Sequence, residues 1–249
     1  MCKWMGWLQT SGLRSALWRV PGVMTTLVLL ATLSSNAWAQ DPNARAAALV
    51  QSADKSLESF LADPQWEALR NLLGGARAVY IVPHDVAGGF LITASGGDGV
   101  LLRRHGGSWS DPIFMHMSTV GVGFVGGGET QSIVMVVMTD SGVEGLISGV
   151  AQLGGSGGFA LANLGVGGGG SGSSLSGGLQ VLTVSTAQGL FAGSQIGGTQ
   201  LSAQAAYNTA VYGPQYDLAG IVAESGGQVS AASGLRDHLA TAVNQAWGR

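Results

Sequence analysis

The residues of this chain that could do chemistry are few, and their spacing predicts no catalytic site. Residues 165–170 (GVGGGG) fit a dinucleotide-binding loop, and residues 154–158 (GGSGG) fit a nucleophile elbow. Neither lies between a clear strand and a helix, and chance matches are expected where glycine is so frequent. Acidic residues are scattered singly, and metal-ligand spacing is missing among His84, His105, His116 and His238. We therefore expect no catalysis, metal or cofactor, and a function that rests on binding.

One stretch suggests what is bound. Residues 183–198 (TVSTAQGLFAGSQIGG) place a bulky pair, Leu190 and Phe191, between Gly189 and Gly193. Its first four residues favour a strand, and the glycines allow a sharp turn or the close approach of another backbone. The stretch is either a core hairpin with a bulge or an apolar wall that faces a ligand.

A second candidate for binding is the glycine-rich turn Gly106–Pro112 (GGSWSDP), which follows Arg103 and Arg104. A hairpin tip here could present the ring of Trp109 and two guanidinium groups to a lipid headgroup. Alternatively, Trp109 closes the end of the core and the arginines are merely solvated.

The first 39 residues have the pattern of an export signal. A basic start is followed by the apolar run Val23–Leu33 and by Ala37-Trp38-Ala39, which fits a cleavage site. We expect cleavage before Gln40 and an exported protein, periplasmic or associated with the cell envelope. The alternative is an uncleaved N-terminal anchor. The only cysteine, Cys2, lies in this leader, so the remainder has no thiol chemistry.

Composition excludes two further classes of protein. The chain is 46% apolar and 10% charged, which argues against disorder. The leader holds three of the 11 Lys and Arg residues and none of the 14 Asp and Glu residues, so the remainder carries a net charge of −6. Lys55 is the only lysine after the leader, and no basic stripe exists to neutralise phosphates. We therefore expect no nucleic-acid partner.

Periodicity predicts an α+β fold that is mainly β. Apolar residues recur at helical spacing in the N-terminal segment and again near the C-terminus, while 31 glycines among the 116 residues from Asp85 to Gln200 separate short strands. Such strands suit a compact, glycine-rich, barrel-like or sandwich core flanked by helices. The expected organisation is a signal peptide (1–39), a helical segment packing on the core (40–75), a β-rich domain (76–224), and a C-terminal linker and helix (225–249).

The order of the motifs resembles the SYLF domain family. From Ala44 to Ile221 the chain carries an apolar strand ending in proline, then G-x-W-S-x-P, a glycine-alternating strand, a hydrophobic strand, L-G-G, S-x-x-x-G-L-F-A-G and N-x-x-x-Y-G. The residues that match these motifs are Val79–Pro83, Gly107, Trp109, Ser110, Pro112, Gly121, Gly123, Ile133–Met138, Leu153–Gly155, Ser185, Gly189–Gly193, Asn208, Tyr212 and Gly213.

The resemblance implies a compact, mostly β domain with flanking helices and an affinity for phospholipid membranes; in eukaryotic members it also implies phosphoinositide and actin binding. We expect an exported, non-catalytic lipid-binding domain whose apolar groove holds acyl chains. Arg103, Arg104, Trp109, Leu190 and Phe191 are its candidate lipid contacts. The alternatives are a structural β protein of the outer membrane or envelope, and a protein–protein interaction module, which in this family would bind actin.

Overall fold

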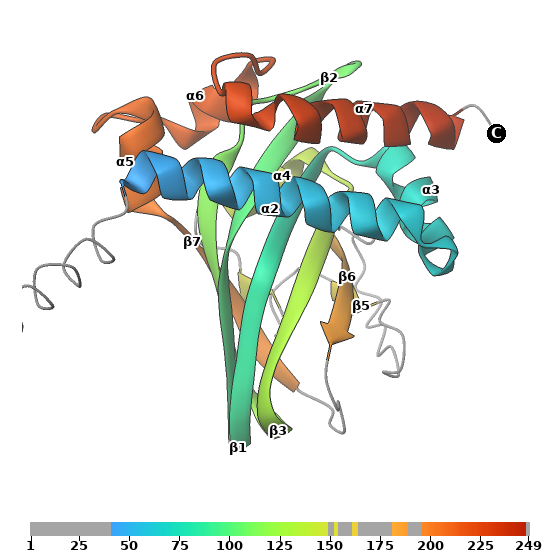
Figure 1. Ribbon diagram of the computed structural model, residues 1–249, viewed down its shortest axis with the longest axis vertical. Helices are drawn as coiled ribbons and strands as arrows, with labels where there is room; N and C mark the ends of the chain where they lie inside the picture. The colour runs from blue at the N-terminus through green and yellow to red at the C-terminus, as the bar shows by residue number, and fades with distance from the viewer. Residues whose placement is uncertain (1–40, 149–151, 154–160, 164–180, 189–195, 248–249) are drawn as a thin grey trace, which may run out of the picture. The chain divides into compact units, whose positions relative to one another are not determined.

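The computed structural model describes residues 41–148, 152–153, 161–163, 181–188 and 196–247 (Figure 1). These residues belong to one compact unit, Asp41–Arg249. The predicted leader lies outside the described residues. None of the helices in these ranges is long and apolar enough to span a bilayer.

The described part of the chain begins with a helical pair. Helix α2 (Pro42–Ala62) starts after Asp41, whose side chain accepts a hydrogen bond from the Asn43 amide and so caps the first turn. A short 3-10 turn, η2 (Pro64–Trp66), leads into α3 (Glu67–Gly75). The buried residues of α2 recur at helical spacing and form one apolar stripe: Ala46, Val50, Ala53, Leu57 and Phe60.

Two long strands form the centre of the sheet. β1 (Ala78–His105) and β3 (Ile113–Val137) pair antiparallel from Ala78↔Val137 to Leu101↔Ile113, with register shifts near Asp85 and Gly89. The two-residue strand β2 (Ser108–Trp109) lies between them in the sequence and pairs with the end of β1.

The other edge of β3 pairs with two strands in succession. β7 (Ile196–Ala203) pairs antiparallel with its first half, and β6 (Val181–Gln188) pairs antiparallel with its second half. β5 (Leu161–Asn163) runs parallel to β6, and β4 (Gln152–Leu153) pairs with β7. The seven described strands form an open, bent sheet rather than a closed barrel.

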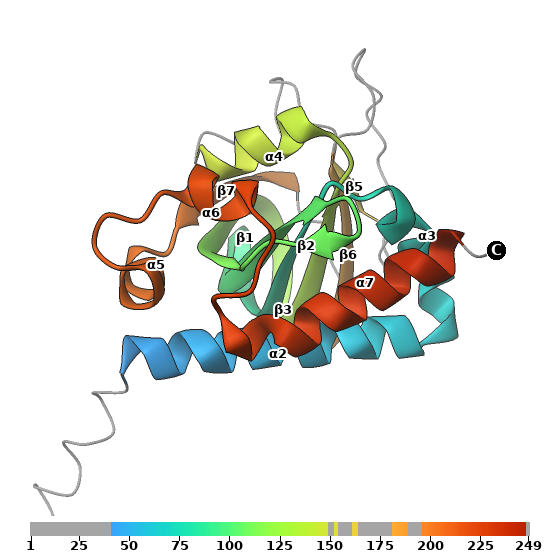
Figure 2. The same ribbon diagram turned by 90° about the horizontal axis from the view of Figure 1, so that it is seen from above.

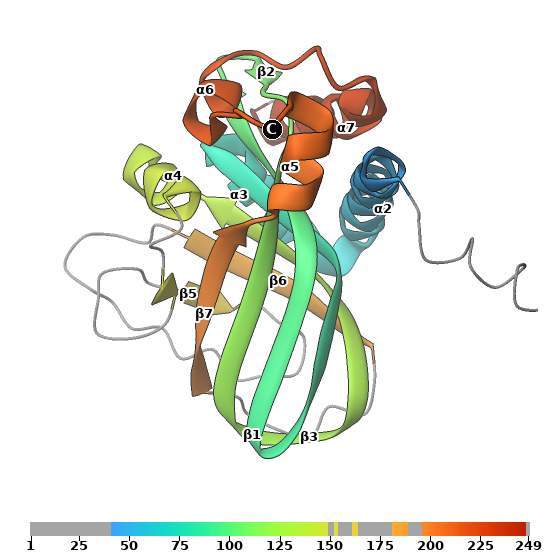
Figure 3. The same cartoon turned by 90° about the vertical axis from the view of Figure 1, so that its left-hand side faces the viewer.

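The β1/β3 ribbon folds back on itself, as Figure 3 shows. Gly89 (φ 141°) and Leu91 (φ 66°) take backbone angles that most L-residues avoid, and β1 reverses there. Beyond the reversal the two arms of β1 lie so close that a Cβ on Gly97 would stand 2.4 Å from the carbonyl oxygen of His84. Glycine at position 97 therefore permits the contact between the arms.

The C-terminal part of the chain is helical. It contains α5 (Ala205–Tyr212), α6 (Leu218–Ala223), the 3-10 turn η3 (Ser230–Ala232) and α7 (Ser233–Trp247); α4 (Asp140–Ile147) follows β3 earlier in the chain. With the N-terminal pair, these helices confirm the predicted α+β fold with helices before and after the strands.

Alternation along β1 separates two apolar cores. Val79 and Ile81 point into a core shared with α2, α3 and α7, whereas Tyr80 and Val82 point into a core shared with α4 and α6. Figure 2 shows α2 and α7 side by side over one part of the sheet and α4 and α6 on the other side. This alternation explains why the strand is apolar without interruption although the sheet has two faces.

Candidate functional site

Two of the sequence motifs, about a hundred residues apart, meet where α5 packs on the start of β3. Asn208 is fully buried; its Oδ1 accepts a hydrogen bond from the Phe114 amide (3.0 Å), and its Nδ2 donates to the Phe114 carbonyl (2.7 Å). Four residues later, on the same side of the helix, the Tyr212 hydroxyl donates to the Pro112 carbonyl (2.5 Å). The N-x-x-x-Y-G motif thus holds α5 on the backbone that follows G-x-W-S-x-P.

Asp111, inside the other motif, binds the segment that leads into α7. Its Oδ2 accepts from the amides of Gly227 (3.0 Å) and Gln228 (2.8 Å). Its Oδ1 accepts from the Val229 amide (3.1 Å) and from Nη1 of Arg236 (2.6 Å). Three backbone donors and one guanidinium satisfy this buried carboxylate, as burial of a charge requires.

The remaining motif residues of this junction shape its turns. The Ser110 hydroxyl accepts from the Arg103 amide and donates to the Asp111 carbonyl, while Gly107 is exposed in the turn before β2. Gly213 (φ 90°) ends α5, and its amide donates to Thr209. These contacts position the elements around a cavity.

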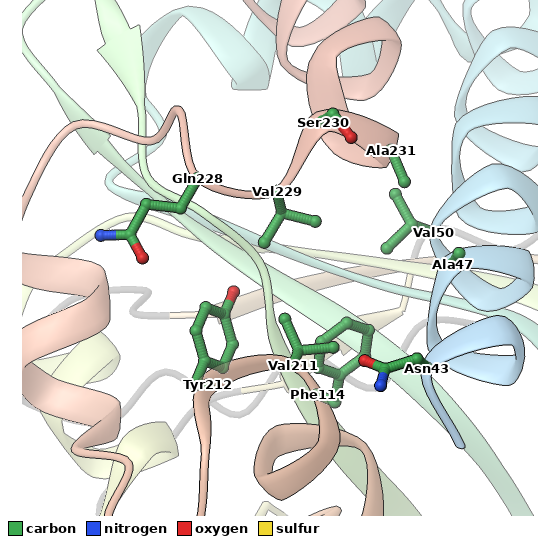
Figure 4. Close-up of a pocket in the computed structure, with 10 residues that line it drawn as sticks. All are labelled: Asn43, Ala47, Val50, Phe114, Val211, Tyr212, Gln228, Val229, Ser230 and Ala231. Atoms are coloured by element: carbon green, nitrogen blue, oxygen red, sulfur yellow. The ribbon is translucent and has the colours of Figure 1, made fainter. Parts of the chain in front are cut away.

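That cavity, shown in Figure 4, has a volume of about 320 Å³ and opens between α2, α5 and the segment before α7. Its apolar lining comes from Ala47, Val50, Phe114, Val211, Val229 and Ala231. Its polar lining comes from Asn43, Tyr212, Gln228 and Ser230. An apolar lining with a few polar groups is typical of sites for small organic or amphipathic ligands.

A second, more polar cavity of about 340 Å³ lies on the far side of Tyr212 and Gln228, which line both. Asp111 lines it, but its oxygens are already occupied as described above. Burial raises the pKa of the Tyr212 hydroxyl far above its ordinary value, and the nearby Asp111 carboxylate raises this pKa further. Tyr212 therefore stays neutral and serves as a hydrogen-bond donor.

The structure does not place Trp109 at an exposed tip. The Trp109 side chain is only 2% exposed and belongs to the core shared with α2, α3 and α7, so the expected presentation of its ring to a lipid headgroup is wrong. The alternative, that Trp109 closes the end of the core, agrees with its position. The physical reason is that α7 packs over β2 and covers the ring.

The two arginines beside Trp109 have partners within the protein. Arg103 donates to Asp140 at the start of α4 (2.9 Å), and Arg104 donates to the carbonyl of Gly74 at the end of α3 (2.7 Å). Both side chains keep some exposure, and their role in lipid binding stays a prediction.

The other predicted lipid contacts are not placed. Leu190 and Phe191, with Gly189 and Gly193, lie outside the described residues. Ser185 belongs to β6, where it pairs with Ile133 of β3. The structure therefore brings the motifs around Trp109 and Asn208 together but does not place the G-L-F-A-G motif.

Titratable side chains gather at one further point. His116 Nδ1 lies 2.7 Å from Asp98 Oδ1, which also accepts from Gln204 Nε2 (2.9 Å) just before α5. Nearby, burial raises the pKa of Asp85, whose Oδ2 accepts from Gln131. Among the described residues no group of three or more His, Cys, Asp or Glu could hold a metal.

Sequence reasoning missed Asp111, Arg236 and the cavity that they support. Asp111 lies inside a motif that was recognised, yet its role requires a partner 125 residues away. Only the position of an acidic residue between Ser110 and Pro112 could have drawn attention to it.

Comparison with known proteins decides the family. The family described as "Ysc84: Las17-binding protein actin regulator" matches residues 118–242, half of the chain, from β3 into α7. The chain belongs to this family. The SYLF resemblance inferred from the motifs is thereby confirmed.

The Ysc84 family includes curated relatives that are longer than the matched region. "SH3 domain-containing YSC84-like protein 1" of Mus musculus is 35% identical over 118 residues, which are 47% of this chain and 34% of that protein. The Xenopus laevis protein of the same name is 32% identical over 130 residues (51% and 38%). "LAS seventeen-binding protein 3" of Saccharomyces cerevisiae is 30% identical over 128 residues (50% and 28%). The chain thus spans about a third of these relatives, and no solved structure matches it.

Proposed function

We propose that this Ysc84-family chain is an exported, non-catalytic lipid-binding domain that holds an acyl chain in the cavity of Figure 4. The observation that carries this proposal is the lining of that cavity, which combines apolar walls with a polar border. Val50 and Phe114 are fully buried beneath the cavity, while Ala47, Val211 and Val229 keep exposed surface. These three come from α2, α5 and the segment before α7, so they offer an acyl chain contact on several sides.

The physics of such a site favours a single-chain amphiphile. The volume of about 320 Å³ lies at the lower end of the range for small-molecule pockets. Each Å² of apolar surface removed from water contributes about 25 cal/mol, so even a partly enclosed chain gains several kcal/mol. Asn43, Gln228 and Ser230 lie where they can hydrogen-bond a headgroup.

The same residues support binding rather than catalysis. The Tyr212 hydroxyl that lines the cavity donates to Pro112, and the neighbouring Asp111 carboxylate is fully occupied by backbone amides and Arg236. The His116–Asp98 pair joins β1 to β3 and is not part of the lining. The cavity therefore presents hydrogen-bonding and apolar groups rather than an activated nucleophile.

Two neighbouring alanines of α2 provide the test. Ala47 lines the cavity, whereas Ala48 is exposed on the solvent side of the helix. Ala47→Trp should fill the cavity and weaken binding of a fluorescent fatty acid such as cis-parinaric acid at least tenfold. Ala48→Trp should bind like the parent chain, and both variants should melt within a few degrees of it.

Equal affinity of the Ala47→Trp and Ala48→Trp variants would show that the cavity is not the lipid site. Failure of the parent chain to bind cis-parinaric acid or lysophosphatidylcholine at all would overturn the proposal. Because all three proteins share residues 1–40, any contribution of the leader cancels in the comparison.

A protein partner is the second candidate function, and the family match favours it. The family description names an actin regulator and Las17 binding, and the yeast relative is named for binding LAS seventeen. The matched residues include β7, α5 and most of α7. Co-sedimentation with actin filaments tests this candidate; a chain that stays in the supernatant at all filament concentrations argues against it.

A further inference from the structure

Exposed apolar side chains are concentrated in the β1/β3 ribbon. Among the described residues, large and exposed apolar side chains are Val86, Leu91, Ile92, Val120 and Trp247. Four of these five belong to the ribbon, and only Trp247 belongs to a helix. Leu91, Ile92 and Val120 are 67%, 69% and 61% exposed, and exposed apolar side chains that gather in one place indicate a binding surface.

Three of these residues and Ala94 lie together, and we call this set the ribbon tip. Ala94 pairs directly with Val120, and Ile92 lies two residues from Ala94, so all three side chains project from the same face. Leu91 adjoins them at the reversal of β1. Figures 1 and 3 both show this bend at the end of the ribbon that is farthest from α2, α5, α6 and α7.

The two strand segments that carry the ribbon tip contain no charged residue over an unusual length. No Asp, Glu, Lys, Arg or His occurs in Val86–Gly97 of β1 or in Met117–Gly128 of β3. Asp85, Asp98, His116 and Glu129 bound these two uncharged segments. Transfer of the ribbon tip into an apolar medium therefore requires no charged group to lose its water.

Part of the backbone around the ribbon tip is already hydrogen-bonded within the sheet. β1 and β3 pair with each other without a break from Gly89↔Val125 to Leu101↔Ile113, and β7 covers the outer edge of β3 from Met115 to Val122. Along these paired edges, the amide and carbonyl groups avoid the large cost of unsatisfied hydrogen bonds in hydrocarbon.

From these observations we propose that the ribbon tip inserts into the apolar layer of a lipid bilayer and is the membrane contact of this domain. The inference rests on the proposed lipid-binding function but concerns a different surface from the cavity. A second copy of the chain is a poorer occupant, because stable protein interfaces bury about 800 Å² on each partner and a few side chains at a narrow bend offer much less.

A site-specific label tests insertion directly. Cys2 is the only cysteine of the chain, so a full-length chain with Cys2→Ser and Ile92→Cys carries one thiol, which can be labelled with the environment-sensitive dye NBD. Vesicles of phosphatidylcholine, alone or mixed with phosphatidylglycerol, should shift the emission to the blue and raise its intensity severalfold. The same label at Ala48→Cys on α2 should not respond.

Unlabelled variants test the energetics without unfolding the chain. Leu91 has a positive φ, which asparagine tolerates better than leucine, so Leu91→Asn removes apolar surface and should not lower stability. Ile92→Thr keeps a β-branched residue in the strand. The double variant should bind vesicles at least tenfold more weakly, since it removes two large aliphatic side chains from the apolar contact. Trp247→Gln, which removes the exposed apolar side chain of α7, should bind like the parent.

The outcomes separate this inference from the proposed function. A silent label at position 92 in the presence of vesicles overturns insertion of the ribbon tip, and the proposed function still stands if cis-parinaric acid binds the cavity. A label that responds without vesicles, in proportion to protein concentration, shows self-association and also overturns the inference. A response that persists in high salt supports it, because the ribbon tip carries no charge for salt to screen.

Discussion

The side chain of Asn208 forms with the backbone of Phe114 the pair of hydrogen bonds that a neighbouring strand would normally provide, although Asn208 belongs to a helix. Its Oδ1 accepts from the Phe114 amide and its Nδ2 donates to the Phe114 carbonyl. The Phe114 carbonyl also accepts from the Gln204 amide, so it keeps a partner when Asn208 is changed. The Phe114 amide points to the same edge of β3 as this carbonyl and donates to Asn208 Oδ1.

This asymmetry predicts the cost of removing the side chain. Asn208→Ala should lower the free energy of unfolding by about 1–3 kcal/mol, the usual cost of leaving one buried amide without an acceptor. Urea denaturation measures the change. Thr209→Ala, at the next and exposed position of α5, is the matched control and should change stability by less than about 0.5 kcal/mol. Equal losses for the two variants would show that the Asn208 bonds do not stabilise the fold.

The Asp111–Arg236 pair should prove far more important than an exposed ion pair. The two side chains are 7% and 15% exposed, and breaking a pair buried to this extent costs about 3–5 kcal/mol. We expect Asp111→Asn and Arg236→Gln each to cost about that much. The double variant should cost less than the sum, with an interaction free energy of about 1–3 kcal/mol in a double-mutant cycle.

A surface pair supplies the control for that cycle. Arg77 and Asp140 lie 3.9 Å apart and are both more than half exposed. Arg77→Gln should change the free energy of unfolding by less than about 1 kcal/mol. Additive losses for Asp111→Asn and Arg236→Gln would mean that Asp111 acts only through the amides of residues 227–229.

These contacts also show which features of the molecule local sequence could reveal. The apolar stripe of α2 and the strand after Ala78 follow from periodicity within one segment, and both were predicted. The order of the motifs was sufficient to indicate the family. Contacts such as Asp111–Arg236 join residues 125 positions apart, and no local pattern contains them.

The continuity of β1 and the position of Trp109 were not predictable for a related reason. Glycine and proline around Leu91 and Trp109 indicate turns, so the sequence predicts short strands and an exposed tip. In the structure, β1 stays paired with β3 on both sides of its register shifts and so continues as one strand, and α7 covers Trp109. Tertiary packing thus overrides the local preference at both places.

The pair between His238 of α7 and Asp54 of α2 predicts a dependence of stability on pH. His238 Nδ1 lies 2.7 Å from Asp54 Oδ1, and this hydrogen bond raises the pKa of His238 above its ordinary value of 6.5; Glu58 and Asp237 add to the increase. A raised folded-state pKa of a histidine contributes stability that is complete below the unfolded-state pKa. The contribution is lost as the pH rises through the folded-state pKa.

Comparison with a His238→Gln variant measures this contribution. The parent should be more stable than the variant by up to about 1 kcal/mol at pH 5, because both partners are partly exposed and solvent screens them. The difference should shrink as the pH rises above 7. Thermal melts from pH 5 to pH 9 follow it, and Asp54→Asn should abolish the same dependence. A difference that stays constant over this range would exclude a role for the charged imidazole.

The start of α2 leads to a prediction about processing of the chain. The pattern Ala37-x-Ala39 predicts cleavage before Gln40, and Asp41, which caps α2, lies just after that point. Cleavage there would leave the capping residue and the whole helix in the product. We expect the exported protein to begin at Gln40, as measured by intact-mass spectrometry, and Ala39→Arg to block the cleavage. Ala44→Arg, on the exposed side of α2, should be processed normally. A product that retains residues 1–39 would instead favour an uncleaved anchor, and residues 41–249 would then remain tethered to the membrane whether or not the ribbon tip inserts.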